Sequence, residues 1–368
     1  MDERLVGVEE ELMLVDPATG RLTGVASRAL RAHEEDGRAD APVEAELFLQ
    51  QIESQTPPTT DVTEIATHLR SSRRVMGEAA RAAGAAAVAT GTAVLVDGDS
   101  EVTPKPRYQR IVEEYGELAR SALACAMHVH VDITDEDEGV RALGGISPWL
   151  PLLLALSANS PYAQGRDTGY ASWRYQTWSR WPSHGTGAGY GSLEDYRSVR
   201  SRLVEWGAAL DDGMLYLDAR LSQTFPTLEL RVADVCSDLE DAVLVTALAR
   251  GLVATEAGRA PAPDPEWRDD LLRAAGWRAS RYGLSGKLVD PRRLELVPAR
   301  DAVATLVDHT RAALDGTGDL ALVEDQVERL LARGNGATQQ RRTFERTGSL
   351  AQVVADAVDR TEASWASR

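Results

Sequence analysis

The chain has 368 residues, of which 43% are hydrophobic and 26% charged, a composition typical of a globular protein with a substantial core. Its 40 basic and 57 acidic residues give a formal net charge of −17, which argues against nucleic acid and against an anionic membrane as partners. Cys125 and Cys236 both lie in apolar surroundings, so we expect two buried thiols in a reducing compartment.

We expect a cytoplasmic protein that does not span a membrane. The first residues, Met1-Asp2-Glu3, lack the positive region and apolar stretch of a secretory signal. The most apolar run, residues 149–158, is well short of the roughly 20 residues that cross a bilayer. It is better explained as a buried helix.

The first part of the chain alternates between strand and helix patterns. The predicted strands cover residues 5–15, 43–56, 85–92 and 127–133, and the predicted helices cover residues 27–35, 108–126 and 149–157. A further helix begins at Asp61, where Asp61-Val62-Thr63-Glu64 resembles a capping box. Residues 160–191 are predicted to form a long loop rich in glycine, arginine and aromatic residues.

The second part is mainly helical. Paired strands are predicted over residues 214–221 and 227–234, and helices over residues 195–210, 239–257, 267–279, 300–314, 320–331 and 349–365. Pro261-Ala262-Pro263 is predicted to be a surface break. Strands concentrate in residues 1–235 and helices in residues 236–368, so we predict one α+β domain over residues 1–368 with a largely antiparallel sheet.

Charged or imidazole side chains recur two residues apart in three predicted strands, where alternate residues share one face. The pairs are Glu9 with Glu11, His128 with His130, and Glu229 with Arg231. A sheet face that gathers such groups is unstable by itself, because buried like charges repel one another and lose hydration. Divalent cations remove that penalty, so the pattern predicts a metal-loaded catalytic face.

Each pair also has a structural explanation that the sequence leaves open. Glu9 and Glu11 could decorate an exposed edge strand, and the two histidines could be buried core residues. Glu229 could form cross-strand salt bridges, since Asp218-Ala219-Arg220 in the preceding predicted strand has the same acid–base spacing.

Two further sets of candidates are less regular. Glu46 and Glu53 are seven residues apart, so they share a face only if a bulge or bend interrupts the strand. In the predicted loop, Arg166 and Arg174 could hold anionic groups of a substrate. A disordered surface loop is the alternative, and the aromatic content of residues 160–174 argues against it.

Taken in order, these segments resemble the glutamate–cysteine ligase type 2 family, in its bacterial carboxylate–amine ligase branch. The matching segments are residues 7–12, 52–56, 107–110, 128–131, 160–174, 227–232 and 281–284. The resemblance extends from about Leu5 to about Ser349. It implies a catalytic fold similar to glutamine synthetase, in which an antiparallel sheet lined by metal ligands and backed by helices carries the same ExE, HxH and ExR strand patterns.

The resemblance also implies roles for single residues. It implies one metal cluster of Glu11, Glu46 and Glu53, and a second of Glu9, His128 and Glu229 beside the nucleotide phosphates. It places His130 near the transferred phosphate, Arg231, Arg174 and Arg166 on the acid substrate, and Asp218 and Arg220 beside the nucleotide. One segment departs from the pattern, because Gly91-Thr92-Ala93-Val94 stands where much of the family has Gly-Thr-His-Pro. Any histidine contact there is lost, which affects the identity of the substrate more than the metal chemistry.

The activity implied by the resemblance is the ATP-dependent joining of a carboxylic acid to an amine, with glutamate and cysteine as the default pair. The carboxylate would attack the γ-phosphorus of ATP to give an acyl phosphate, while Mg²⁺ or Mn²⁺ neutralises the phosphate oxygens. The amine would then displace phosphate and leave an amide. Oxygen-rich ligation favours Mg²⁺ over Zn²⁺ despite the histidines. A homodimer is usual for this branch.

Two functions of other classes stay open. A metal-dependent amide or ester hydrolase is suggested by the HxH pattern with nearby carboxylates, and it would favour zinc and consume no nucleotide. A catalytically idle ligand-binding homologue is kept open by the altered segment at residues 91–94. The retained set of candidate metal ligands argues against this second alternative.

Overall fold

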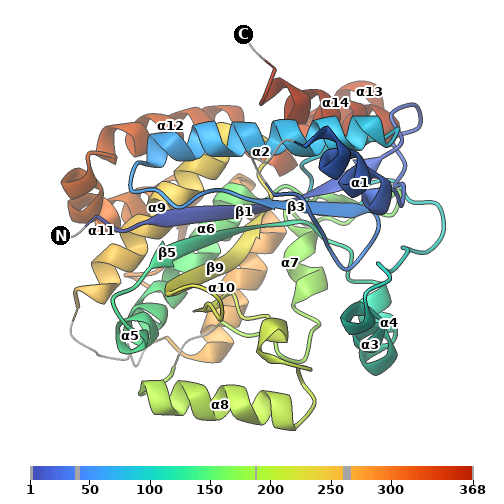
Figure 1. The fold of residues 1–368 in the computed structure, drawn as a ribbon. Coiled ribbons are helices and arrows are strands. Elements are labelled where there is room, and N and C mark those ends of the chain that lie inside the picture. The colour runs from blue at the N-terminus through green and yellow to red at the C-terminus, as the bar shows by residue number, and fades with distance from the viewer. Residues whose placement is uncertain (1–2, 38–41, 187–188, 260–266, 367–368) are drawn as a thin grey trace.

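The computed structural model describes residues 3–37, 42–186, 189–259 and 267–366 (Figure 1). At its centre lies an antiparallel sheet in the order β2-β3-β1-β5-β9-β8, with β4 paired to β1. The strands are β1 (Val6–Val15), β2 (Glu44–Ala45), β3 (Gln51–Gln55), β4 (Ala86–Val88), β5 (Ala126–Asp132), β8 (Ala219–Leu221) and β9 (Thr227–Asp234). The predicted α+β class with a largely antiparallel sheet is confirmed.

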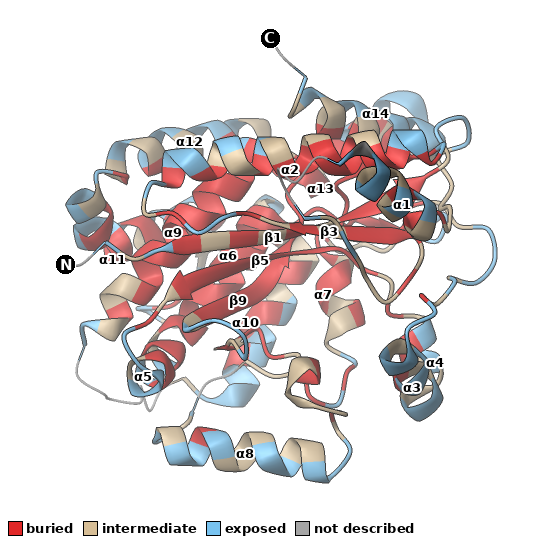
Figure 2. Cartoon of the chain, viewed as in Figure 1, coloured by how far each residue is buried: buried red, intermediate tan, exposed pale blue. Residues whose placement is uncertain are grey.

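Helices surround this sheet. They are α1 (Ala26–Asp36), α2 (Val62–Ala82), α3 (Pro106–Tyr115), α4 (Glu117–Arg120), α5 (Glu136–Ile146), α6 (Leu150–Ser157), α7 (Trp173–Trp178), α8 (Leu193–Glu205), α9 (Leu239–Ala257), α10 (Asp269–Tyr282), α11 (Ala299–Thr317), α12 (Leu320–Arg333), α13 (Gly336–Thr347) and α14 (Leu350–Ala363), with short 3₁₀ turns at Ser147–Trp149, Asp212–Met214 and Gly283–Ser285. The predicted helix at residues 239–257 coincides with α9, which is buried on nearly all sides (Figure 2). It is apolar around its whole circumference because it packs against α2, α5, α6, α11 and α12 at once.

The two halves of the chain share one core. A single cluster of buried apolar side chains runs from Val6 on β1 to Leu330 on α12 and includes β5, β9, α6 and α9. Burial in Figure 2 is continuous from the central strands into these helices, whereas the outer faces of α8 and α12 are exposed. This shared core is consistent with the predicted single domain, which stays a prediction.

Strand β1 explains how the sheet presents two different faces. Its side chains alternate, so that Val8, Glu10 and Leu12 are buried while Glu9 and Glu11 are half-buried on the other side. The carboxylate of Glu10 is completely buried, and the guanidinium of Arg73 on α2 donates to it at 2.6 and 2.8 Å. The face with Glu10 therefore packs on helices, and the face with Glu9 and Glu11 is free for a site.

One continuous helical stretch among the described residues, Glu136–Ser157, has the length and apolar composition of a membrane-spanning helix. It joins α5 to α6, and most of it is buried inside the protein, as expected for a core helix. Cys125 and Cys236 are buried free thiols, which confirms the predicted burial of both side chains.

Several predicted elements are corrected by the structure. The predicted strand at 43–56 is split into β2 and β3, and the predicted helix at 108–126 is broken at Gly116 (φ +56) and ends at Arg120. The predicted loop at 160–191 contains the hairpin β6 (Tyr162–Ala163) and β7 (Arg166–Asp167) followed by α7. Helix α13 and the hairpin β10 (Lys287–Asp290) and β11 (Glu295–Pro298) were not predicted. The predicted break at Pro261-Ala262-Pro263 lies outside the described residues.

Candidate metal and substrate site

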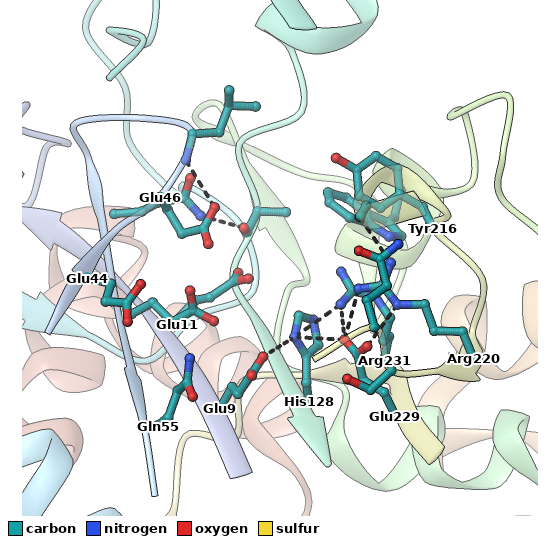
Figure 3. Close-up of a pocket in the computed structure, with 18 of the residues that line it drawn as sticks. Glu9, Glu11, Glu44, Glu46, Gln55, His128, Tyr216, Arg220, Glu229 and Arg231 are labelled. Carbon is teal, nitrogen blue, oxygen red and sulfur yellow. Dashed lines mark hydrogen bonds and ion pairs between the residues drawn. The ribbon is translucent and has the colours of Figure 1, made fainter. Parts of the chain in front are cut away.

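A cavity of about 560 Å³ opens on the polar face of the sheet. Its floor is formed by β3, β1, β5 and β9, and its walls by α3, the end of α7 and the segments around Tyr216 and Phe225. The predicted site residues that line it are Glu9, Glu11, Glu46, Glu53, His128, His130, Arg220, Glu229 and Arg231. Figure 3 shows Glu11, Glu44 and Glu46 on one side of this cavity, and His128, Arg220, Arg231 and Glu229 on the other.

Strand register brings these side chains together. Glu11 lies directly opposite Glu53 on β3, and Glu9 lies directly opposite His128 on β5. Glu229 on β9 faces both of its neighbours, because it pairs with His130 on one side and with Arg220 on the other. Residues directly opposite one another on adjacent strands are close enough for their side chains to interact. Antiparallel pairing therefore gathers residues that are far apart in sequence.

Glu11, Glu46 and Glu53 form the first cluster, called here the carboxylate cluster. One carboxylate oxygen from each lies within 4.8 Å of the others. Glu46 reaches the cluster because β2 ends at Ala45 and the chain turns before β3 begins, which is the interruption that the seven-residue spacing requires. Among the described residues, no lysine or arginine forms an ion pair with these three carboxylates.

The electrostatics of the carboxylate cluster favour a bound cation. Burial and the neighbouring Glu46 raise the pKa of Glu11 to about 8, and the same two causes raise the pKa of Glu53 well above its ordinary value. Without a cation, raised pKa values favour protons on Glu11 and Glu53, and a divalent ion would displace them. An all-oxygen donor set suits Mg²⁺ or Mn²⁺.

Glu9, His128, His130 and Glu229 form the second cluster, called here the imidazole cluster. The Glu9 carboxylate lies 3.1 Å from His128 Nδ1 and 3.3 Å from His130 Nε2. Ligand atoms of Glu9, His130 and Glu229 lie within 4.8 Å of one another, and so do those of Glu9, Glu53 and His128. Burial works to raise the pKa of Glu9, but the two imidazoles outweigh it and hold this pKa well below its usual range.

The two imidazoles differ in what their Nε2 atoms contact. Both atoms are buried and neither forms a hydrogen bond among the described residues, but His130 Nε2 lies 3.3 Å from the Glu9 carboxylate, whereas His128 Nε2 is free. His130 Nδ1 lies 2.9 Å from Thr227 Oγ1, which orients the ring. Burial and the nearby Arg231 lower the pKa of His128 to about 4, so its imidazole is neutral at physiological pH. Neutral imidazole with a free nitrogen is the form that binds a metal ion.

Glu229 is both a candidate metal ligand and a partner in cross-strand salt bridges, the two explanations that the sequence left open. It forms cross-strand ion pairs, because Arg220 Nε donates to it at 2.8 Å and Arg231 also pairs with it. Burial alone would raise the pKa of Glu229, but Arg231 and Arg220 keep it well below its ordinary value. The salt bridges thus hold Glu229 in the ionised form that the imidazole cluster needs.

Three predicted residues, Arg166, Arg174 and Asp218, do not line this cavity, and the roles that the resemblance implies for them stay predictions. Arg174 is 2% exposed, donates to the carbonyls of Val232 and Arg231 at 3.2 and 3.0 Å, and lies 3.8 Å from Asp234. Its guanidinium is therefore occupied by the protein itself. Asp218 accepts a hydrogen bond from the Tyr175 hydroxyl at 3.2 Å and lies 3.4 Å from His184.

Arg166 lies in the β6–β7 hairpin and faces a different cavity, together with the altered residue Ala93. Arg281 stacks on Tyr170, with its guanidinium carbon 5.4 Å from the ring centroid. Neither Arg281 nor Lys287 lines the cavity on the sheet.

Sequence reasoning missed other residues of the cavity. Glu44, Gln55 and Tyr216 line it, as Figure 3 shows, and so do Trp178 and Phe225. The pair spacing used for the metal ligands contained no signal for them, because they come from a short edge strand, a strand end, the end of α7 and irregular segments. Arg107 and Tyr108 also line the wall, and their segment is one of those that carry the resemblance.

The chain is similar to known proteins in both sequence and fold. The model of the glutamate–cysteine ligase family 2 (GCS2) matches residues 5–356. The chain is 49% identical to a candidate glutamate–cysteine ligase 2-1 from Nocardioides sp., over 98% of this chain and 97% of that protein. It is 46% identical to a candidate glutamate–cysteine ligase 2-2 from Frankia alni, over 99% of this chain and 98% of that protein. A solved glutamate–cysteine ligase from Francisella tularensis, in complex with AMP, has the same fold at a TM-score of 0.70 and 12% identity, over 100% of this chain and 90% of that one.

Proposed function

This chain belongs to the glutamate–cysteine ligase family 2, and from that premise we propose that it is an ATP-dependent carboxylate–amine ligase. Its default substrates are glutamate as the acid and cysteine as the amine. The observation that carries the proposal is the arrangement of the carboxylate and imidazole clusters, which meet at Glu9 and Glu53 beside two arginines. Such an arrangement suits a polyphosphate with divalent cations.

The donor atoms fit divalent cations. The carboxylate cluster of Glu11, Glu46 and Glu53 would hold one Mg²⁺ or Mn²⁺ ion, and the imidazole cluster would hold a second through Glu9, Glu229 and an imidazole. The resemblance indicates His128 as this imidazole ligand, whereas the ligand atoms of Glu9 and Glu229 gather with His130. When bound, these ions supply positive charge that neutralises phosphate oxygens and aligns the transfer.

Besides the metal ions, two arginine side chains of the protein, Arg220 and Arg231, supply positive charge in the cavity. Arg231 is buried and paired with Glu229, and its Nε has no hydrogen-bond partner among the described residues. We assign that free donor to an oxygen of the acid substrate or of the phosphoryl group in transfer. Arg220 also lines the cavity and pairs with Glu229, which suits a contact with the nucleotide phosphates.

The reaction then proceeds in two steps. The acid carboxylate attacks the γ-phosphorus of ATP, so that ADP leaves and an acyl phosphate remains. The amine attacks the acyl carbon, phosphate leaves with the bonding electrons, and the nitrogen gives up a proton to form the amide. The aromatic side chains of Trp178, Trp181 and Tyr216 line one side of the cavity and would shield the acyl phosphate from water on that side.

The test is release of ADP and phosphate from ATP with Mg²⁺, measured with a panel of carboxylic and amino acids, each with and without cysteine. Release that requires both an acid and an amine supports the ligase and identifies its substrates. Metal-dependent hydrolysis of amides or esters without ATP would instead support a hydrolase. A cytoplasmic homodimer stays a prediction from the sequence, which size-exclusion chromatography with light scattering tests for its oligomeric part.

A further inference from the structure

A second cavity, of about 690 Å³, lies outside the sheet and is called here the arginine cavity. It is bounded by the β6–β7 hairpin, by the segment around Ala93, by the end of α4 and by α7. The hairpin is fixed in place because Gln164 and Gly165 donate backbone hydrogen bonds to the carbonyls of Ala93 and Val94. None of the metal-ligand candidates lines this cavity.

A thin wall separates the arginine cavity from the cavity on the sheet. In the extended segment after α4, Ser121 and Leu123 face the arginine cavity, whereas Ala122 and Ala124 face the cavity on the sheet. Helix α7 divides its residues in the same way, with Thr177 on one side and Trp178 on the other. A ligand of the arginine cavity would therefore lie behind the reaction site without entering it.

Three arginine side chains line this cavity without an ion-pair partner among the described residues. Arg120, Arg166 and Arg180 are exposed and all line this cavity. Among the described residues, the side chains of Arg120 and Arg166 have no ion-pair or hydrogen-bond partner, and Arg180 donates only to the carbonyls of Thr177 and Ser121 at 3.2 Å. In a chain with a net charge of −17, three such arginines around one cavity indicate a site for an anion.

The other lining residues restrict the kind of anion. Asp99 and Glu117 are exposed in the same cavity and form no ion pair among the described residues. They would repel a phosphate or a simple dicarboxylate, but they would attract an ammonium group. Trp173 and Leu123 add an apolar surface for a short side chain.

From these observations we propose that the arginine cavity binds a free amino acid, with its carboxylate on Arg120, Arg166 or Arg180 and its ammonium group near Asp99 or Glu117. This site is separate from the reaction cavity. The proposal does not rest on the ligase function, because binding here requires neither ATP nor a divalent cation.

Isothermal titration calorimetry of the full chain with L-glutamate, in the presence of a chelator and without ATP, tests the proposal. The test protein is a double variant that carries both Arg120→Ala and Arg166→Ala. The matched control is Arg202→Ala on α8, because Arg202 is also exposed and lies outside both cavities. We expect the double variant to bind L-glutamate at least about tenfold more weakly than the wild type. Arg202→Ala should bind it as the wild type does.

Two further titrations locate the ligand and identify its chemistry. Arg231→Ala should keep this binding, and glutarate and inorganic phosphate should bind more weakly than L-glutamate because both lack the ammonium group. Loss of binding in Arg231→Ala with full binding in the double variant would place the ligand in the reaction cavity and overturn the proposal. Phosphate binding as tight as that of L-glutamate would overturn the amino-acid assignment, and so would the absence of binding to the wild type.

Discussion

The Glu11 carboxylate is expected to destabilise the metal-free protein, and Glu11→Gln measures this effect. Burial and Glu46 raise the pKa of Glu11 from its ordinary value of 4.5 to about 8. Between these two values the folded state holds a proton that the unfolded chain has released, so the free energy of unfolding falls as the pH rises. At about pH 7 only the part of the shift between 4.5 and 7 counts, and it corresponds to ~3 kcal/mol at about 1.4 kcal/mol per pH unit. Water in the cavity screens the half-buried carboxylate, so we expect about 1–3 kcal/mol.

Glutamine removes the charge and keeps the shape. The backbone N–H of Ala126 donates to Glu11 at 2.8 Å, and the amide oxygen of glutamine can accept the same hydrogen bond. In a chelating buffer at about pH 7, Glu11→Gln should therefore raise the free energy of unfolding by about 1–3 kcal/mol. Saturating Mg²⁺ should reverse the order, because only the wild type retains the complete carboxylate cluster and ligand binding stabilises the folded state.

Urea denaturation between about pH 5 and pH 8, with chelator and with Mg²⁺, measures these differences. Glu44→Gln is the control, because Glu44 is an exposed carboxylate opposite Glu53 at the edge of the same cavity. It should change the stability by less than about 0.5 kcal/mol. A Glu11→Gln protein that is less stable than the wild type in chelator, or that shows the same pH dependence, would refute the reasoning.

Four other substitutions separate catalytic from structural roles. Glu53→Gln and His128→Ala should each abolish ATP-dependent phosphate release while circular dichroism shows an intact fold, and normal ATP consumption by either would contradict the metal assignment. Arg174→Ala should lower the free energy of unfolding by about 3–5 kcal/mol, because it leaves a buried carboxylate without its cation; unchanged stability with a raised KM for the acid would restore Arg174 as a substrate residue. Glu10→Ala should destabilise by a similar amount, since it leaves the guanidinium of Arg73 buried and unpaired, and equal urea midpoints for variant and wild type would argue against that pairing.

The sequence predicts the strands of the site well because their side-chain spacing matches the two-residue repeat of a strand. Glu9, Glu11, His128, His130 and Glu229 all lie on the face that the spacing indicates, and the predicted strand at 227–234 coincides with β9. These elements are long enough for their own pattern to determine the face. Among the long helices after residue 235, α11, α12 and α14 have apolar residues that recur at helical spacing, whereas α9 is apolar on all sides.

Elements that depend on distant partners are not visible in the sequence. Glu46 joins the carboxylate cluster only because the chain turns between β2 and β3, and the spacing of seven residues gives no position for that turn. The role of Arg174 also depends on distant partners. The carbonyls that accept its hydrogen bonds belong to β9, 57 and 58 residues further along the chain. An arginine in a loop has the same local sequence whether it binds a substrate or the protein itself.

The register of β1 connects the stability of the fold to the composition of the site. Glu9, Glu10 and Glu11 are consecutive, so a shift of one residue would exchange the face that carries two carboxylates with the face that carries one. Only the middle carboxylate meets a fully buried guanidinium, that of Arg73, which also donates to the carbonyls of Cys236 and Ser237 at 2.8 and 3.3 Å. In the shifted register two carboxylates would face the helices with one guanidinium between them, and a buried unpaired charge costs several kcal/mol. The buried pair therefore selects the register in which Glu9 and Glu11 face the cavity, and the fold excludes the alternative before any metal ion is bound.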